Sequence, residues 1–161
     1  MKLEMLLILL SISVIQASAE TTRWYDYEEG ILTSSITEKP AIIDFYADWC
    51  GPCIAMETGT YPDSRVVSEL RDFIAIKVDT QKRIDIETKY GIAYYPTVVF
   101  LDPKGKEITR HIGYLGPEEM VEEIKQSRGK LPKETPGFEA LYILTVFIAL
   151  LVIKRTIGRI S

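Results

Sequence analysis

The most informative segment of this chain is Asp44-Phe45-Tyr46-Ala47-Asp48-Trp49-Cys50-Gly51-Pro52-Cys53. It begins inside the run 41–46 (AIIDFY), which is apolar except for Asp44 and Tyr46 and is typical of a strand covered on both faces. The cysteines follow at once, where a helix that continues to about residue 60 would begin. We therefore expect Cys50 to open a helix, with Cys53 one turn further along it.

This position suits thiol chemistry. The first N–H groups of a helix are unpaired and its dipole favours an anion, so a thiolate on Cys50 would be stabilised there. Cys53 would lie on the same side, within reach of a disulfide, and Pro52 fits the first turn because no N–H is required of it. The spacing predicts disulfide exchange in which Cys50 attacks and Cys53 resolves.

The pair holds the only two cysteines of the chain, and there is one histidine, His111. Two cysteines are too few for a framework of structural disulfides or for a Cys-only zinc site, and His111 cannot complete a zinc site with them. Two buried structural thiols are the alternative to a redox pair, but that role gives no reason for Trp49, Gly51 and Pro52 to surround them. We expect no metal and no cofactor other than a redox-active Cys50–Cys53 disulfide.

Length and charge limit the remaining possibilities. The 161 residues fit one domain with short appendages, and the net charge of −4 offers no basic face for nucleic acid. Outward from the cysteines, apolar patterns predict further strands at 73–79, 98–101 and 107–112, and helices at 24–38 (interrupted by Gly30), at 84–90 and at 117–127. Pro62 and Asp63 are expected to break the helix after the cysteines and restart it. This order predicts an α/β fold with a central mixed β-sheet flanked by helices.

The two ends of the chain predict export and anchoring. Residues 1–19 end in Ala17-Ser18-Ala19 after an apolar run, which is typical of a signal peptide; an uncleaved anchor is the alternative. Residues 129–137 read as a tether, and residues 138–160 as a transmembrane helix, with an interfacial or buried helix as the alternative. Its cationic end would stay in the cytoplasm. We expect a single-pass protein of the cell membrane whose domain, residues 20–128, is extracytoplasmic.

The quoted stretch resembles the active-site strand and loop of thioredoxins, and Tyr95-Pro96-Thr97 resembles their cis-proline loop. Lys39-Pro40 and residues 57–66 (ETGTYPDSRV) are more similar still to the C-terminal exported domain of the thiol:disulfide interchange protein DsbD. The resemblance covers about residues 24–127 and implies a thioredoxin fold.

The resemblance also implies roles for single residues. Catalytic roles fall to Cys50 as nucleophile, Cys53 as resolving thiol, Asp44 as the buried acid that shuttles a proton, Lys77 as its partner, and Glu57 as a second acid. Substrate-binding roles fall to Trp49, Gly51, Pro52, Tyr95 and Pro96, with Pro96 in the cis form beside a backbone edge that is free to pair with an extended substrate. From the sequence alone Asp44 could instead be only hydrogen-bonded in place, Glu57 and Lys77 only solvated, and Trp49 only packed.

The function expected from these residues is that of an oxidoreductase that reduces disulfides in exported proteins. An oxidase or isomerase, or a redox-sensing or holding module without turnover, are the alternatives. Protein disulfides are the expected substrates. We expect no multi-helix membrane domain like that of DsbD in this chain, so the resemblance implies a separate membrane electron donor of the CcdA or DsbD type.

Overall fold

The structure is a computed structural model that describes residues 21–132, 142 and 144–148. The chain divides into two compact units, Met1–Lys130 and Leu131–Ser161. No helix within the described ranges is long and apolar enough to cross a membrane. The predicted signal segment, 1–19, lies outside those ranges, as do most of the predicted tether, 129–137, and most of the predicted membrane helix, 138–160.

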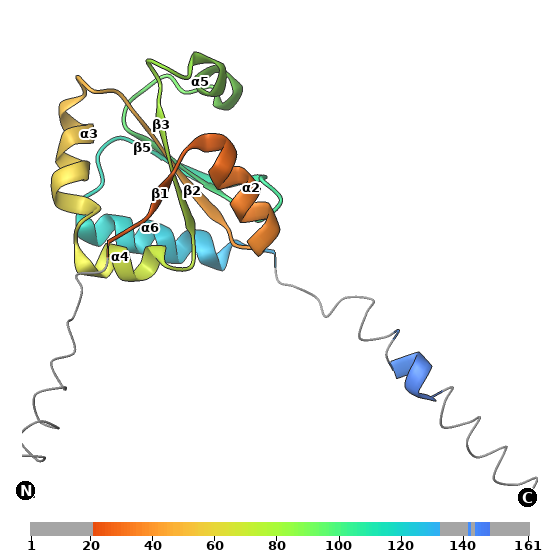
Figure 1. The fold of residues 1–161 in the computed structure, drawn as a ribbon. Coiled ribbons are helices and arrows are strands. Elements are labelled where there is room, and N and C mark those ends of the chain that lie inside the picture. The colour runs from red at the N-terminus through yellow and green to blue at the C-terminus, as the bar shows by residue number, and fades with distance from the viewer. Residues whose placement is uncertain (1–20, 133–141, 143, 149–161) are drawn as a thin grey trace, which may run out of the picture. The chain divides into compact units, whose positions relative to one another are not determined.

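The first unit is built on a five-stranded mixed sheet in the order β1-β3-β2-β4-β5 (Figure 1). The strands are β1 (Trp24–Tyr25), β2 (Ala41–Tyr46), β3 (Ile74–Asp79), β4 (Thr97–Leu101) and β5 (Glu107–Ile112). β1, β3 and β2 run parallel, whereas β4 is antiparallel to β2 and β5 is antiparallel to β4. The predicted mixed sheet is confirmed, and the cysteines follow the end of its central strand.

Helices cover both faces of this sheet (Figure 1). They are α2 (Tyr27–Thr37), α3 (Gly51–Ala55), the π-helical turn η1 (Met56–Thr60), α4 (Ser64–Leu70), α5 (Ile84–Tyr90) and α6 (Pro117–Gly129). Because successive strand residues face opposite sides, β2 contributes to two cores. Ile42 belongs to the core with η1, α4 and α6, and Ile43 belongs to the core with α2 and α5. Asp44 therefore points to the same side as Ile42.

The start of the domain differs from the prediction of one helix over 24–38. Trp24 and Tyr25 pair with Ala75 and Ile76 as a short edge strand, and α2 begins only after Asp26. Gly30 does not interrupt the helix. It lets α2 approach β3, because a Cβ at Gly30 would lie 2.4 Å from Cγ1 of Ile76.

The helix after the cysteines also changes form along its length. It reaches residue 60 as predicted, but its second half is a π-helical turn, in which the N–H of Tyr61 bonds to the carbonyl of Met56, N to O 2.9 Å. After Pro62 the chain restarts as α4, where the carboxylate of Asp63 accepts from the N–H of Arg65. The predicted break is confirmed, and Tyr61, just before it, lies in the same core as Ile42.

Candidate active site

Cys50 is the N-cap residue of α3, the position predicted from the sequence. Its Sγ accepts a hydrogen bond from the N–H of Cys53, with an N to S distance of 3.2 Å. The two cysteines form a disulfide whose Cα atoms lie 5.2 Å apart. One of the unpaired N–H groups of the helix start is thus already directed at the sulfur of Cys50, where it would stabilise a thiolate once the bond is opened.

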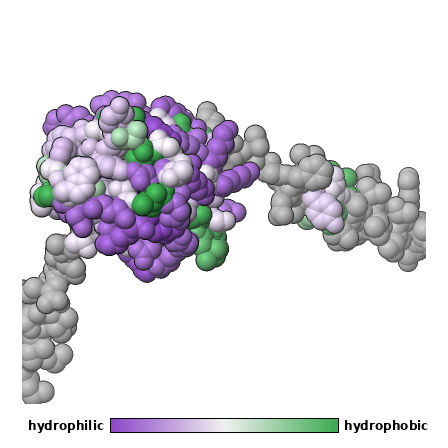
Figure 2. All heavy atoms as spheres, turned by 90° about the horizontal axis from the view of Figure 1, so that it is seen from above, coloured by the Kyte–Doolittle hydropathy of each residue, from purple (hydrophilic) through white to green (hydrophobic). Residues whose placement is uncertain are grey.

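The two cysteines of the disulfide are buried, although the residues between and just before them are exposed. Cys50 is 4% exposed and Cys53 is 7% exposed, so exposure does not separate an outer from an inner thiol in this oxidised state. Tyr46 and Tyr95 pack against the cluster that the cysteines form with Ala47. Trp49 is 69% exposed, and Gly51 and Pro52 are exposed as well. Figure 2 looks onto the end of the domain where α3 begins, and shows pale and green side chains gathered there among hydrophilic ones.

The loop before β4 faces this segment. The Tyr95–Pro96 peptide bond is cis, as the resemblance implied. The pairing of β4 with β2 stops at Thr97 opposite Phe45, so Tyr95 and Pro96 lie beyond the end of that ladder. The carbonyl of Pro96 accepts from the N–H of Gly113, N to O 2.8 Å.

Tyr95 links this loop to two other parts of the site. Its ring meets the ring of Trp49 edge to face, with centroids 5.9 Å apart. Its hydroxyl donates to the carboxylate of Glu87 on α5, and this bond raises the pKa of the Tyr95 phenol. The cis-proline loop, the cysteine segment and α5 are therefore joined through one side chain.

Asp44 is buried in the interior and lines a pocket together with Cys53. It is 4% exposed, and its Oδ1 has no hydrogen-bond partner in the part of the chain that the structure describes. Burial disfavours the carboxylate and raises the pKa of Asp44 to about 6, an effect that the charge of Lys77 and the hydroxyl of Tyr61 oppose. A pocket of about 270 Å³ is lined by Asp44, Cys53, Glu57 and Lys77 among others. Four of the predicted catalytic residues thus share one pocket.

Lys77 and Glu57 occupy the outer part of that pocket. Lys77 is the register partner of Asp44 on β3, yet its ammonium forms its ion pair with Glu57 on η1. Burial lowers the pKa of Lys77, which the charge of Asp44 opposes. The side chain of Glu57 is 56% exposed. Glu57, the second acid that the resemblance implied, therefore lies at the rim of the pocket with its charge paired to Lys77.

Three aromatic residues of this site were missed by the sequence analysis. The rings of Trp24, Tyr46 and Tyr61 surround the ammonium of Lys77 at 4.7, 5.8 and 5.4 Å from their centroids. Tyr46 stands in the quoted stretch, and Tyr61 in the run that resembles DsbD, but no spacing connects either to Lys77. Trp24 belongs to the edge strand that the sequence did not predict.

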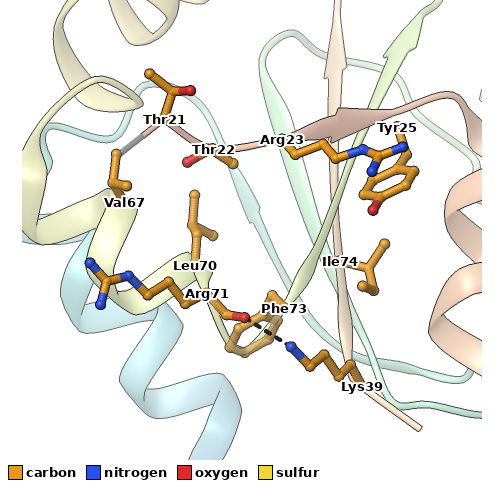
Figure 3. Close-up of a pocket in the computed structure, with 10 residues that line it drawn as sticks. All are labelled: Thr21, Thr22, Arg23, Tyr25, Lys39, Val67, Leu70, Arg71, Phe73 and Ile74. Atoms are coloured by element: carbon orange, nitrogen blue, oxygen red, sulfur yellow. Dashed lines mark hydrogen bonds between the residues drawn. The ribbon is translucent and has the colours of Figure 1, made fainter. Parts of the chain in front are cut away.

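Other candidate sites lie away from the cysteines. A pocket of about 400 Å³ is lined by residues of the β1 segment, of α4 and of the chain just before β2 and β3. There the ammonium of Lys39 donates to the carbonyl of Arg71 (Figure 3). This pocket contains none of the predicted site residues. His111 lies on β5 with its Nδ1 3.5 Å from a carboxylate oxygen of Glu123. Within the described ranges, no three His, Cys, Asp or Glu side chains are grouped so that they could hold a metal ion.

The sequence was compared with protein families and with known proteins. Residues 19–126 match the thioredoxin family. The thiol:disulfide interchange protein DsbD of Pseudoalteromonas atlantica is 33% identical over 88 residues, an alignment that covers 52% of this chain but 15% of that protein. The thioredoxin of Borreliella burgdorferi is 39% identical over 82 residues, covering 51% of this chain and 68% of that one.

Solved structures agree as well. The solution structure of a thioredoxin from Thermus thermophilus superposes with a TM-score of 0.61 at 26% identity, and the match covers 66% of this chain and 86% of that one. The family match extends over more than half of the 161 residues and includes the cysteines, the buried acid and the cis-proline. This chain therefore belongs to the thioredoxin family.

Proposed function

We propose that this protein is a membrane-anchored, extracytoplasmic reductase of disulfides in exported proteins. The observation that carries the proposal is the Cys50–Cys53 disulfide at the start of α3. Cys53 lines one pocket with the buried Asp44, and Tyr95 of the cis-proline loop packs against the cysteines. The similarity to a thiol:disulfide interchange protein supports disulfide exchange. The predicted signal and membrane segments are the reason for proposing anchoring and a place outside the cytoplasm.

The reaction begins from the reduced cysteines. The Cys50 thiolate attacks one sulfur of the substrate disulfide, which breaks the substrate S–S bond and forms a mixed disulfide; the other substrate sulfur leaves as a thiolate and takes up a proton. Cys53 then loses its proton and attacks Sγ of Cys50. The mixed disulfide breaks, the Cys50–Cys53 bond forms, and the second substrate thiol is released. Two electrons and two protons pass to the substrate in total.

Asp44 is the group that accepts the proton of Cys53 in this scheme. Both line the same pocket, and a carboxyl whose pKa is raised to about 6 exchanges a proton near neutral pH more readily than an ordinary aspartate. Asp44→Asn should slow exchange around pH 7 and leave the fold intact.

Substrates would be held by the exposed surface around the cysteines. Tyr95 precedes cis-Pro96 beyond the last pair of the β2–β4 ladder, where an extended segment can add backbone hydrogen bonds. Trp49 offers an exposed ring next to the attacking sulfur. Reducing equivalents would come from a membrane protein of the CcdA or DsbD type that carries its own dithiol.

Insulin reduction with dithiothreitol as the electron source tests the activity. The protein should accelerate it, Cys50→Ser should abolish the acceleration, and Cys53→Ser should accumulate mixed disulfides with its substrates. No acceleration by the unmodified protein would favour a module that binds partners without turnover.

The reduction potential tests the direction of electron flow. A value near about −270 mV, as in reducing thioredoxins, supports a reductase, whereas a value near about −120 mV would indicate an oxidase. Faster alkylation of Cys53 than of Cys50 at neutral pH would reverse the assignment of the attacking thiol.

A further inference from the structure

The ammonium of Lys77 is enclosed by three aromatic rings that come from three separate segments. Trp24 lies on β1, Tyr46 at the end of β2, and Tyr61 directly after η1, with centroids 4.7, 5.8 and 5.4 Å from Nζ. The rings of Trp24 and Tyr61 also meet edge to face at 4.7 Å. We call these three residues the aromatic cage.

The cage offsets a cost of burying the lysine. The side chain of Lys77 is 21% exposed, and burial disfavours its charged form. A long, flexible lysine in this situation tends to extend its head to water. Ring faces attract an ammonium most strongly when water is excluded, so the cage favours a charged Lys77 that stays inside.

Inside the domain, the charge of Lys77 acts on Asp44. The two residues are register partners on β3 and β2, but within the described residues the direct ion pair of Lys77 is with Glu57. Oδ1 of Asp44 therefore has no hydrogen-bond partner in the described part of the chain, and the charge of Lys77 acts on Asp44 without a direct ion pair. The other titratable groups on this side are Tyr61 and Tyr46 from the cage, Glu57 on η1, Cys53 and Asp48 on the pocket wall, and Asp79 on β3 with its ion-pair partner Lys82.

We propose that Trp24, Tyr46 and Tyr61 are positioning residues that hold the ammonium of Lys77 beside Asp44 and so set the pH range in which Asp44 exchanges a proton with Cys53. The inference rests on the proposed function for its use in catalysis, but the cage itself can be tested without turnover. Without the cage, Lys77 would turn outward with Glu57, and Asp44 would lose the charge that favours its carboxylate.

Trp24→Leu in the full chain is the test, because Trp24 supplies the nearest ring and stands on an edge strand. The readout is the carboxyl ¹³C chemical shift of Asp44 against pH in the oxidised protein, where neither cysteine titrates; Asp44→Asn assigns the signal. The titration midpoint should move up by about one pH unit, the change expected when a charge moves a few ångströms away at an effective dielectric constant of about 20. Trp24→Phe, which keeps a ring, should retain most of the original midpoint.

The Lys77→Met background separates positioning from packing. There, Trp24→Leu should leave the midpoint where Lys77→Met alone puts it, because no ammonium remains to be held. An unchanged midpoint in the single variant, or an equal shift in the Lys77→Met background, would overturn the inference. If Trp24→Leu does not fold, Tyr46→Leu is measured in its place with the same two backgrounds. If the protein shows the predicted shifts but does not reduce insulin, the role of the aromatic cage is supported and the proposed function is contradicted.

Discussion

At the scale of single residues, the protonation of the buried Asp44 is coupled to the stability of the fold. Folding raises its pKa from 3.8 to about 6, so the folded state holds the proton more tightly than the unfolded chain. The stability associated with this proton is fully present below about pH 4 and is lost as the pH rises through about 6. A shift of this size corresponds to about 3 kcal/mol. At neutral pH the protein therefore bears a cost for keeping a buried acid in the pocket that Cys53 lines.

Asp44→Asn should remove that cost. We expect the oxidised variant to be more stable than the original protein by up to about 3 kcal/mol at pH 8, because the amide carries no charge to desolvate. The gain should shrink toward zero at pH 4. Urea unfolding at pH 4, 6 and 8 measures it, and a gain that is equal at all three values would show that the charge of Asp44 is not its cause.

At the scale of elements, the patterns of the sequence located most of the structure. The strand at 41–46, the helix at 84–90 and the strand at 107–112 agree with β2, α5 and β5. The apolar run at 41–46 and the glycine that stops the helix at 91 are strong local signals. β1 was missed because two residues cannot show a period. Only its pairing with β3 makes it a strand.

The residues of the site that belong to local sequence motifs could be predicted. Cys50 and Cys53 follow from their spacing, and Pro96 follows from the resemblance. The aromatic cage does not, because Trp24 and Tyr61 reach Lys77 only through the folding of segments far apart in the chain. Long-range contacts of this kind leave no pattern in a single sequence.

The contact between α2 and β3 provides a test at this scale. Gly30→Ala would place a Cβ 2.4 Å from Ile76 in a packed interior, so α2 must move or Ile76 must change rotamer. We expect a loss of about 1–3 kcal/mol in the free energy of unfolding. Gly129→Ala at the end of α6, where an added Cβ meets nothing within 4 Å, is the matched control and should be neutral or slightly stabilising. Equal effects in the two variants would contradict the proposed close approach.

At the scale of the whole molecule, the proposed topology makes its own prediction. A spanning helix is retained by burial in hydrocarbon, so the full chain should remain in membrane fractions through carbonate and high salt. In intact, fully reduced cells an impermeant maleimide should label Cys50, with Cys50→Ser as the control for labelling elsewhere. Release by carbonate would favour an interfacial helix, and protection of Cys50 until the cells are permeabilised would place the domain in the cytoplasm.

The register of β2 against β3 also limits how this protein can change in length. Asp44 and Lys77 are paired across the two strands and face the side that holds Tyr61. An insertion or deletion of one residue within either strand would turn one of the two side chains to the opposite face, into the core with Phe45 and Ile76. A change of length in a connection between elements does not alter the alternation of side chains within the two strands. Viable length variants of this domain should therefore be confined to its connections, since the spacing inside both strands is fixed by packing and, under the proposed function, by proton transfer as well.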